Sequence, residues 1–90
     1  MKVQYRKKFL KQLSRIPPEI RLKIEKFVFE ELPCKSSISE SGKIEKLSGY
    51  KNFYKVRFGI YRLGIESKNK TKILVIRTVM HRKEIYKYFP

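Results

Sequence analysis

The chain has 90 residues and a formal net charge of +15, because 23 Lys and Arg side chains stand against only 8 Asp and Glu. Residues 1–90 are therefore expected to form one small domain with a marginal core. The 41% share of hydrophobic residues argues against disorder. A charge well above the magnitude of about 2–8 that suits a small domain predicts an anionic partner: nucleic acid, an acidic protein or a membrane surface.

Cysteine and histidine are too scarce for several classes of protein. The single Cys34 cannot form an internal disulfide and fits a reducing cytoplasm. One Cys and one His are too few for a metal site of the usual ligands, so neither metal nor cofactor is expected. No apolar run approaches the roughly 20 residues of a membrane span. The first eight residues lead into no long apolar segment, which argues against a signal peptide.

The first half of the chain predicts a strand and two helices. Residues 3–5 suit a short strand, and apolar residues then recur at helical spacing in two stretches. Pro17 and Pro18 separate the stretches, because a residue before proline avoids helical geometry and proline suits the first turn of a helix. The two helices form an αα-hairpin. The predicted apolar stripes are Phe9, Leu10, Leu13 and Ile16 in the first helix, and Ile20, Ile24, Phe27, Val28 and Leu32 in the second.

The second half predicts a sheet. A serine-rich loop follows Leu32, and residues 44–47 resume an alternating pattern. Residues 67–71 carry turn residues, and the β-branched run 73–76 predicts a strand buried on both faces. Residues 81–90 are expected to form a helical turn or two. In the continuation of the last strand, Arg77, Val79 and His81 are expected on one face, and Thr78 and Met80 on the other.

Residues 53–62 predict a hairpin with one apolar and one basic face. Gly59-Ile60 suits a two-residue type II′ turn, which fixes the register. Arg57 is then opposite Arg62, with Lys55 two residues away on the same face. Like charges opposite each other destabilise a sheet, so the arrangement predicts a functional anion pocket. The apolar face is expected to hold Tyr54, Val56 and Phe58 opposite Ile65, Leu63 and Tyr61.

Three segments together resemble the signature of the RelE/ParE superfamily of bacterial and archaeal toxins. They are Leu47-Ser48-Gly49, Tyr54-Lys55-Val56-Arg57-Phe58-Gly59-Ile60-Tyr61-Arg62, and His81-Arg82-Lys83-Glu84-Ile85-Tyr86. The resemblance implies an α+β domain in the order β-α-α-β-β-β, with an N-terminal strand, an αα-hairpin packed on a twisted antiparallel sheet and a short C-terminal helical turn. It also implies a ribosome-dependent mRNA interferase that cuts mRNA in the A site and is silenced by an antitoxin.

Metal-free RNA cleavage needs a base for the 2′-hydroxyl, cations for the developing phosphorane charge and an acid for the 5′-oxygen. Arginine suits the cationic role because its fork can bond two phosphate oxygens. By resemblance, Arg57 and Arg62 are expected to stabilise this charge, Lys55 to act as base or positioner, and Arg82 to contact a phosphate. Each of these could also be an ordinary surface cation.

The proton donor is less defined in the sequence. The resemblance favours Tyr86 for proton transfer or base stacking, with Tyr88 as a possible substitute. His81 is a candidate because imidazole exchanges protons near neutral pH, although a lone histidine at a strand end is commonly a structural hydrogen-bonding group. Lys46, Lys51 and Phe53 are expected to contribute to RNA binding by phosphate contact or base stacking.

The expected partners are an acidic RelB-like antitoxin, a 70S-type ribosome and mRNA, with no membrane. Two other classes remain open at this point. One is a ParE-like inhibitor of DNA gyrase on the same fold, against which the basic cluster argues. The other is a non-enzymatic RNA-binding repressor of translation, in which the charge serves binding alone.

Overall fold

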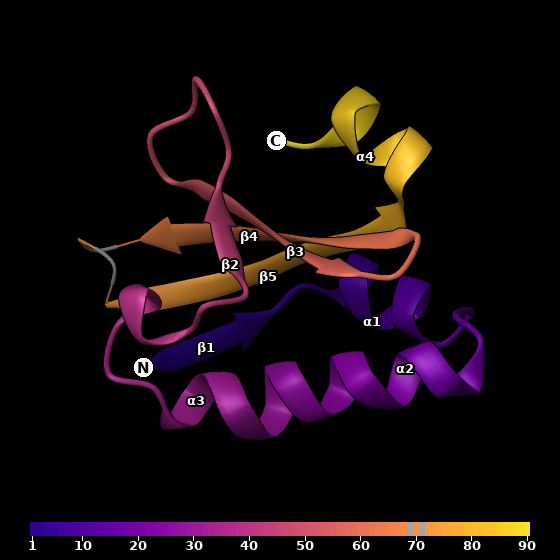
Figure 1. The fold of residues 1–90 in the computed structure, drawn as a ribbon, viewed down its shortest axis with the longest axis horizontal. Coiled ribbons are helices and arrows are strands. Elements are labelled where there is room, and N and C mark those ends of the chain that lie inside the picture. Colours follow the sequence, from indigo (N-terminus) through magenta and orange to yellow (C-terminus); the bar gives the residue numbers. More distant parts are fainter. Residues whose placement is uncertain (69, 71) are drawn as a thin grey trace.

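The computed structural model describes residues 1–68, 70 and 72–90, and Figure 1 shows their arrangement. Five strands form one sheet in the spatial order β1-β5-β4-β3-β2. The strands are β1 (Lys2–Tyr5), β2 (Ile44–Lys46), β3 (Phe53–Phe58), β4 (Tyr61–Lys68) and β5 (Ile73–His81). The helical elements are α1 (Lys7–Leu13), α2 (Pro18–Glu25), the π-helical η1 (Lys26–Glu31), α3 (Leu32–Cys34), the 3₁₀ turn η2 (Ile38–Glu40) and α4 (Arg82–Tyr88).

The α+β class expected from the sequence is confirmed. The helices α1 and α2 cover one face of the sheet, while α4 lies over the other (Figure 1). Two details differ from the expected order. The short β2 adds a fourth strand after the helices, and β1 pairs with β5 in parallel, so that the sheet is mixed rather than wholly antiparallel. The predicted turn at 67–71 includes residues 69 and 71, which lie outside the described residues.

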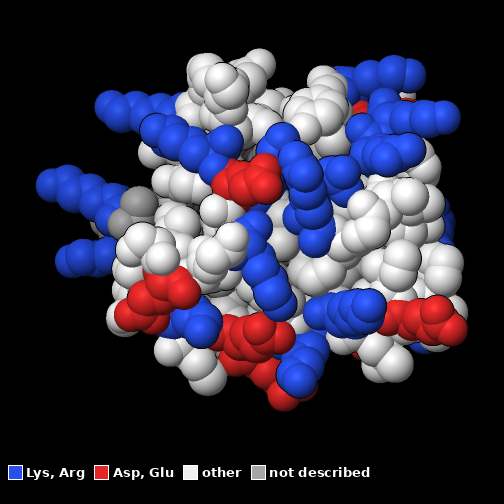
Figure 2. Space-filling model, in the orientation of Figure 1, with Lys and Arg blue, Asp and Glu red and all other residues white. Residues whose placement is uncertain are grey.

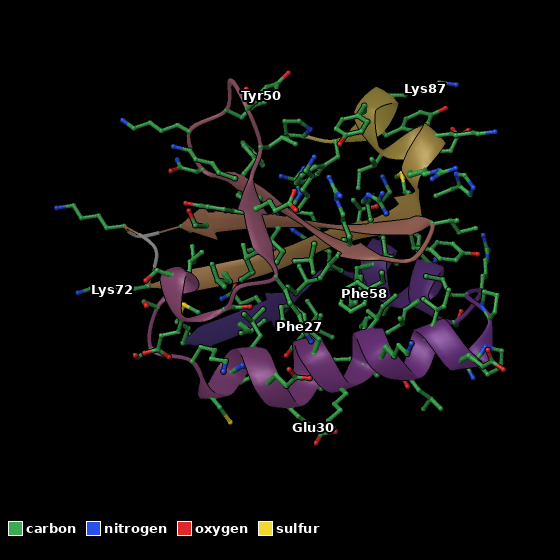
Figure 3. All side chains as sticks on the ribbon, viewed as in Figure 1. Phe27, Glu30, Tyr50, Phe58, Lys72 and Lys87 are labelled. Atoms are coloured by element: carbon green, nitrogen blue, oxygen red, sulfur yellow. The ribbon has the colours of Figure 1, made fainter. Side chains whose placement is uncertain are left out.

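The main core lies between the helical layer and the sheet. Phe27 and Phe58, both labelled in Figure 3, meet in this core. Their rings make an edge contact with centroids 5.7 Å apart. Leu10 was expected in the apolar stripe but is 43% exposed, because the position next to Phe9 turns about 100° away from the buried face. The fully buried side chains include Phe9, Ile24, Phe27, Val28, Leu32, Val56, Leu63, Ile65, Leu74 and Ile76.

The second helical stretch is continuous in space but changes hydrogen-bond pattern at η1. The amide of Leu32 donates to the carbonyl of Phe27, a five-residue step. The corresponding donor for Val28 would come from Pro33, which has no N–H. The Tyr5 hydroxyl supplies it instead, donating to the Val28 carbonyl at 2.6 Å. Burial raises the pKa of this hydroxyl. The first strand is thereby tied to the second helix.

An irregularity in β5 changes which face its side chains occupy. The β4–β5 register shifts between Gly64 and Ile65, so Arg77 is an extra residue on β5. Arg77 bonds Glu66 at 2.8 Å on the face that carries α4, whereas Val79 belongs to the core under the helices. The expectation that Arg77 shares a face with Val79 and His81 is therefore wrong, since strict alternation fails at the bulge.

The end of β5 extends beyond β1, and α1 satisfies part of its open edge. The side-chain oxygen of Gln12 accepts hydrogen bonds from the Thr78 hydroxyl at 2.7 Å and from the Val79 amide at 3.0 Å. These bonds fix the far end of β5, from which α4 begins. In the described ranges, no helix is long and apolar enough to span a membrane.

Candidate active site

The hairpin register expected from the sequence is confirmed. Arg57 pairs with Arg62, and Lys55 pairs with Gly64. Gly59 has a φ of 61°, the left-handed value that the first central position of a type II′ turn requires. The apolar side of the hairpin lies in the main core, so the three basic side chains are on the face away from α1 and α2. A two-residue turn thus gathers three cations on one accessible surface.

Lys55 and Tyr86 come together on this face although they are far apart in sequence. The Lys55 Nζ donates a hydrogen bond of 2.8 Å to the Tyr86 hydroxyl and lies 5.4 Å from the centre of its ring. The Lys55 side chain is only 19% exposed, whereas Tyr86 is 60% exposed. The phenol therefore covers the ammonium and remains accessible to a ligand itself.

Glu45 is a member of this site that sequence reasoning missed. One carboxylate oxygen lies 3.9 Å from Lys55 Nζ and the other lies 3.7 Å from Arg57 Nε. The position follows from the pairing of β2 with β3, in which Glu45 is opposite Lys55. The alternating pattern at residues 44–47 indicated a strand but not its register. The Arg57–Glu45 pair is exposed at both ends, and such pairs are worth only about 0–1 kcal/mol, so a phosphate can replace Glu45 as the partner of Arg57.

Arg62 is held at the turn end of the hairpin. Its Nη1 donates to the Gly59 carbonyl at 2.7 Å and to the Tyr61 carbonyl at 2.9 Å. Both bonds come from the same nitrogen, so the remaining guanidinium nitrogens can bond a phosphate oxygen. The Arg82 amide donates to the Ile60 carbonyl at 2.7 Å. The exposed Arg82 therefore begins α4 beside the same turn as Arg62.

A second apolar cluster holds α4 against the sheet. Ile85 and Phe89 are buried with Leu47, and Phe53 and Met80 pack on them. The ring of Phe89 lies directly on Gly64, where a Cβ would be 3.0 Å from the ring carbons. The absence of a side chain at this position allows the helix to approach. Because α4 carries Tyr86, this cluster sets the distance between Tyr86 and Lys55.

Arg77 strengthens the same attachment. It bonds Glu66, and its guanidinium lies 5.9 Å from the ring centres of both Phe53 and Phe89. Phe53 also makes an edge contact with Phe89 at 5.5 Å. Phe53 is therefore packed into the cluster, and its expected stacking on an RNA base has to compete with these contacts.

The structure does not bring His81 to the three cations. His81 pairs with Tyr61 on the side of the sheet that faces the helices, and the two rings are 6.3 Å apart. Its Nδ1 accepts a hydrogen bond of 3.1 Å from the Lys83 amide. The side chain therefore caps the N-terminus of α4. Adjacent residues of a strand face opposite ways, which separates this imidazole from the face of Arg62.

The two lysines expected to bind RNA lie outside the cluster. Lys46 pairs with Tyr54, so the strand directs it to the face opposite Lys55. Lys51 is exposed in the connection between β2 and β3. In the described part of the chain, no group of three His, Cys, Asp or Glu side chains could hold a metal ion.

The fold and this face together define a small basic α+β domain in which three cations lie beside a phenol. The family described as "ParE toxin of type II toxin-antitoxin system, parDE" matches residues 3–86. The curated Toxin RelE3 of Methanocaldococcus jannaschii is 43% identical over 91 residues, with all of both chains covered. The chain therefore belongs to the ParE/RelE family of toxins of type II toxin–antitoxin systems, and it is of the RelE kind.

Solved structures agree with this assignment. The RelE chain in the crystal structure of the RelB–RelE antitoxin–toxin complex from Methanococcus jannaschii is similar, with a TM-score of 0.75 and 38% identity. The match covers 97% of this chain and 99% of that chain. The RelBE2 toxin–antitoxin complex from Mycobacterium tuberculosis shares the fold at 24% identity, with a TM-score of 0.67 over 90% of this chain and 96% of that one.

Proposed function

We propose that this toxin is a ribosome-dependent endoribonuclease that cleaves mRNA in the A site by metal-free attack of a 2′-hydroxyl. The observation that carries the proposal is the Lys55–Tyr86 hydrogen bond of 2.8 Å beside two directly opposed arginines. This face offers an amine, a phenol and two guanidinium groups within one small accessible area. Phosphodiester transfer needs groups of these kinds.

The geometry supports the following roles. The 2′-oxygen attacks its own phosphorus, the bond from phosphorus to the 5′-oxygen breaks, and a 2′,3′-cyclic phosphate and a 5′-hydroxyl result. Arg57 and Arg62 stabilise the charge on the non-bridging oxygens. The Tyr86 oxygen accepts its bond from Lys55, which leaves its own proton for the 5′-oxygen. Lys55 positions Tyr86, and in its neutral amine form, which keeps N–H groups for this bond, it is our candidate to receive the proton of the 2′-hydroxyl.

Arg82 and His81 receive different assignments. Arg82 lies beside the turn that carries Arg62, and we assign it a flanking phosphate. His81 caps α4, and we assign it to positioning the helix that carries Tyr86 rather than to proton transfer. Lys51 and Phe53 remain candidates for contacts with RNA outside the cleaved bond.

The partners are also inferred. RelE from Methanococcus jannaschii forms a complex with the antitoxin RelB, and we infer that this chain binds an acidic RelB-like antitoxin. Opposite charge would speed that association. The ribosome, mRNA and a cytoplasmic location follow from the proposed reaction.

A translation extract with end-labelled mRNA tests the proposal against its alternatives. The wild-type toxin is expected to give cuts at codon spacing, and Arg62→Ala is expected to abolish them. Intact mRNA together with trapped gyrase–DNA adducts would instead identify a ParE-like gyrase inhibitor. Arrested translation with intact mRNA and no adducts would identify a non-enzymatic repressor.

A further inference from the structure

A basic groove borders the active site on the side of the long helical stretch. It has a volume of about 470 Å³ and lies between α2 with η1 on one side and the end of the β3–β4 hairpin on the other. In Figure 2, Lys and Arg side chains cross this side of the molecule between α4 and the helices below the sheet. The groove is lined by Lys23, Lys26, Glu31, Lys43, Arg57, Phe58 and Gly59.

The charge of the groove is strongly one-sided. Four basic side chains line it and Glu31 is its one carboxylate. Glu31 already lies 3.6 Å from Lys43. Lys23 and Lys26 are three residues apart and share a helix face. Within the described residues, neither lies within 4.0 Å of a carboxylate oxygen. Gathering these cations costs repulsion that an anion in the groove would relieve.

Arg57 joins the groove to the active site. It lines the groove and is also opposite Arg62 in the hairpin. Its side chain is 63% exposed, and Glu45 is its only ion-pair partner in the described part of the chain. A polyanion that bonds Arg57 can therefore extend from the active site into the groove without leaving contact with positive charge.

The lining favours a nucleic acid over a protein. Interfaces with proteins have an apolar centre, but the only large apolar side chain in the lining, Phe58, is itself 9% exposed. A phosphate backbone needs only cations and room. We propose that the groove formed by Lys23, Lys26, Lys43 and Arg57 binds the phosphodiester backbone of RNA that flanks the cleaved bond. This inference rests on the proposed function for the identity of the RNA, which is the mRNA strand or ribosomal RNA.

A binding experiment separates this proposal from the chemistry. All proteins in the experiment carry Arg62→Ala, so that RNA is not cut. The groove variant adds Lys23→Gln and Lys26→Gln, and a matched control variant adds two substitutions elsewhere. The control is Lys68→Gln with Lys72→Gln, which removes the same charge. Both control residues are exposed, and Figure 3 shows Lys72 projecting from the edge of the molecule away from the α2–hairpin groove. The probes are a labelled single-stranded RNA oligonucleotide and ribosomes without mRNA.

The groove variant is expected to bind RNA more weakly than the control variant. Its plot of log affinity against log salt concentration should also be less steep by about 1.4, or about 0.7 for each of the two lost phosphate contacts. Loss with the oligonucleotide would assign the groove to mRNA, and loss with vacant ribosomes alone would assign it to ribosomal RNA. Equal losses in the two variants would overturn the proposal. The proposal would also be overturned if the groove variant bound RNA as well as the control but bound a polyglutamate peptide more weakly. None of these results depends on whether the wild type cuts mRNA.

Discussion

Lys55 and Tyr86, separated by 31 positions in the chain, are joined by a hydrogen bond of 2.8 Å. The lysine comes from the middle of β3 and the tyrosine from α4, so the bond exists only when the helix is docked on the sheet. A proton-transfer site built in this way depends on tertiary packing as much as on its own two residues.

Tyr86→Phe removes the phenolic proton and keeps the ring. We expect kcat for cleavage of ribosome-bound mRNA to fall roughly 10²–10⁴-fold, the usual contribution of general acid–base catalysis, with thermal stability little changed. Tyr88→Phe is the matched control, because Tyr88 is similarly exposed at 62% and lies on the same helix. A rate for Tyr86→Phe equal to that of the wild type would remove Tyr86 from the chemistry.

Gly64→Ala tests the attachment of α4. The new methyl group would meet the Phe89 ring at 3.0 Å, and such overpacking typically costs about 1–3 kcal/mol. We expect Phe89 to shift, the Lys55–Tyr86 distance to change and cleavage to weaken. Gly42→Ala is the control, since no atom lies within 4 Å of a Cβ there. Denaturant unfolding and initial cleavage rates measure both effects. If Gly64→Ala matched the wild type in both stability and cleavage rate, the contact between Gly64 and Phe89 would not position the helix.

His81→Asn separates capping from proton transfer. Asparagine is a good N-cap, so this variant is expected to keep both stability and the pH profile of kcat. His81→Ala should lose about 0.5–2 kcal/mol of stability through the lost cap. A fall in kcat for His81→Asn as large as that for Tyr86→Phe would restore His81 as a proton-transfer group.

Tyr5→Phe tests the link between the first strand and the π-helical turn. It leaves the Val28 carbonyl without its hydroxyl donor, and we expect a loss of about 1–3 kcal/mol in the free energy of unfolding. Burial raises the pKa of Tyr5 above 10.0, so the folded state holds this proton more tightly than the unfolded state. Its contribution is fully present below pH 10 and is lost as the pH rises through the folded pKa. The wild type should therefore lose stability more steeply than Tyr5→Phe in alkaline solution, and parallel curves would contradict this.

The basic face of the hairpin could be predicted because a two-residue turn fixes the pairing of Arg57 with Arg62. The rest of the site depends on longer connections. Glu45 follows a loop whose length leaves the register of β2 free, and Tyr86 reaches Lys55 only because Gly64 admits Phe89. The predicted face of Arg77 was wrong, because one extra residue in a strand reverses the alternation of side chains that follows it. The local sequence pattern therefore determines where the cations lie, whereas tertiary packing determines which side chains contact them.

The central claim is that a 2′-hydroxyl of the mRNA attacks its own phosphate on the face formed by Lys55, Arg57, Arg62 and Tyr86. The most direct test uses purified ribosomes programmed with two mRNAs that differ by a single 2′-deoxynucleotide at the cleaved position of the A-site codon. The all-ribose mRNA should be cut to a product ending in a 2′,3′-cyclic phosphate, and the deoxy-substituted mRNA should stay intact. Equal cleavage of both mRNAs, or of neither, would contradict the account.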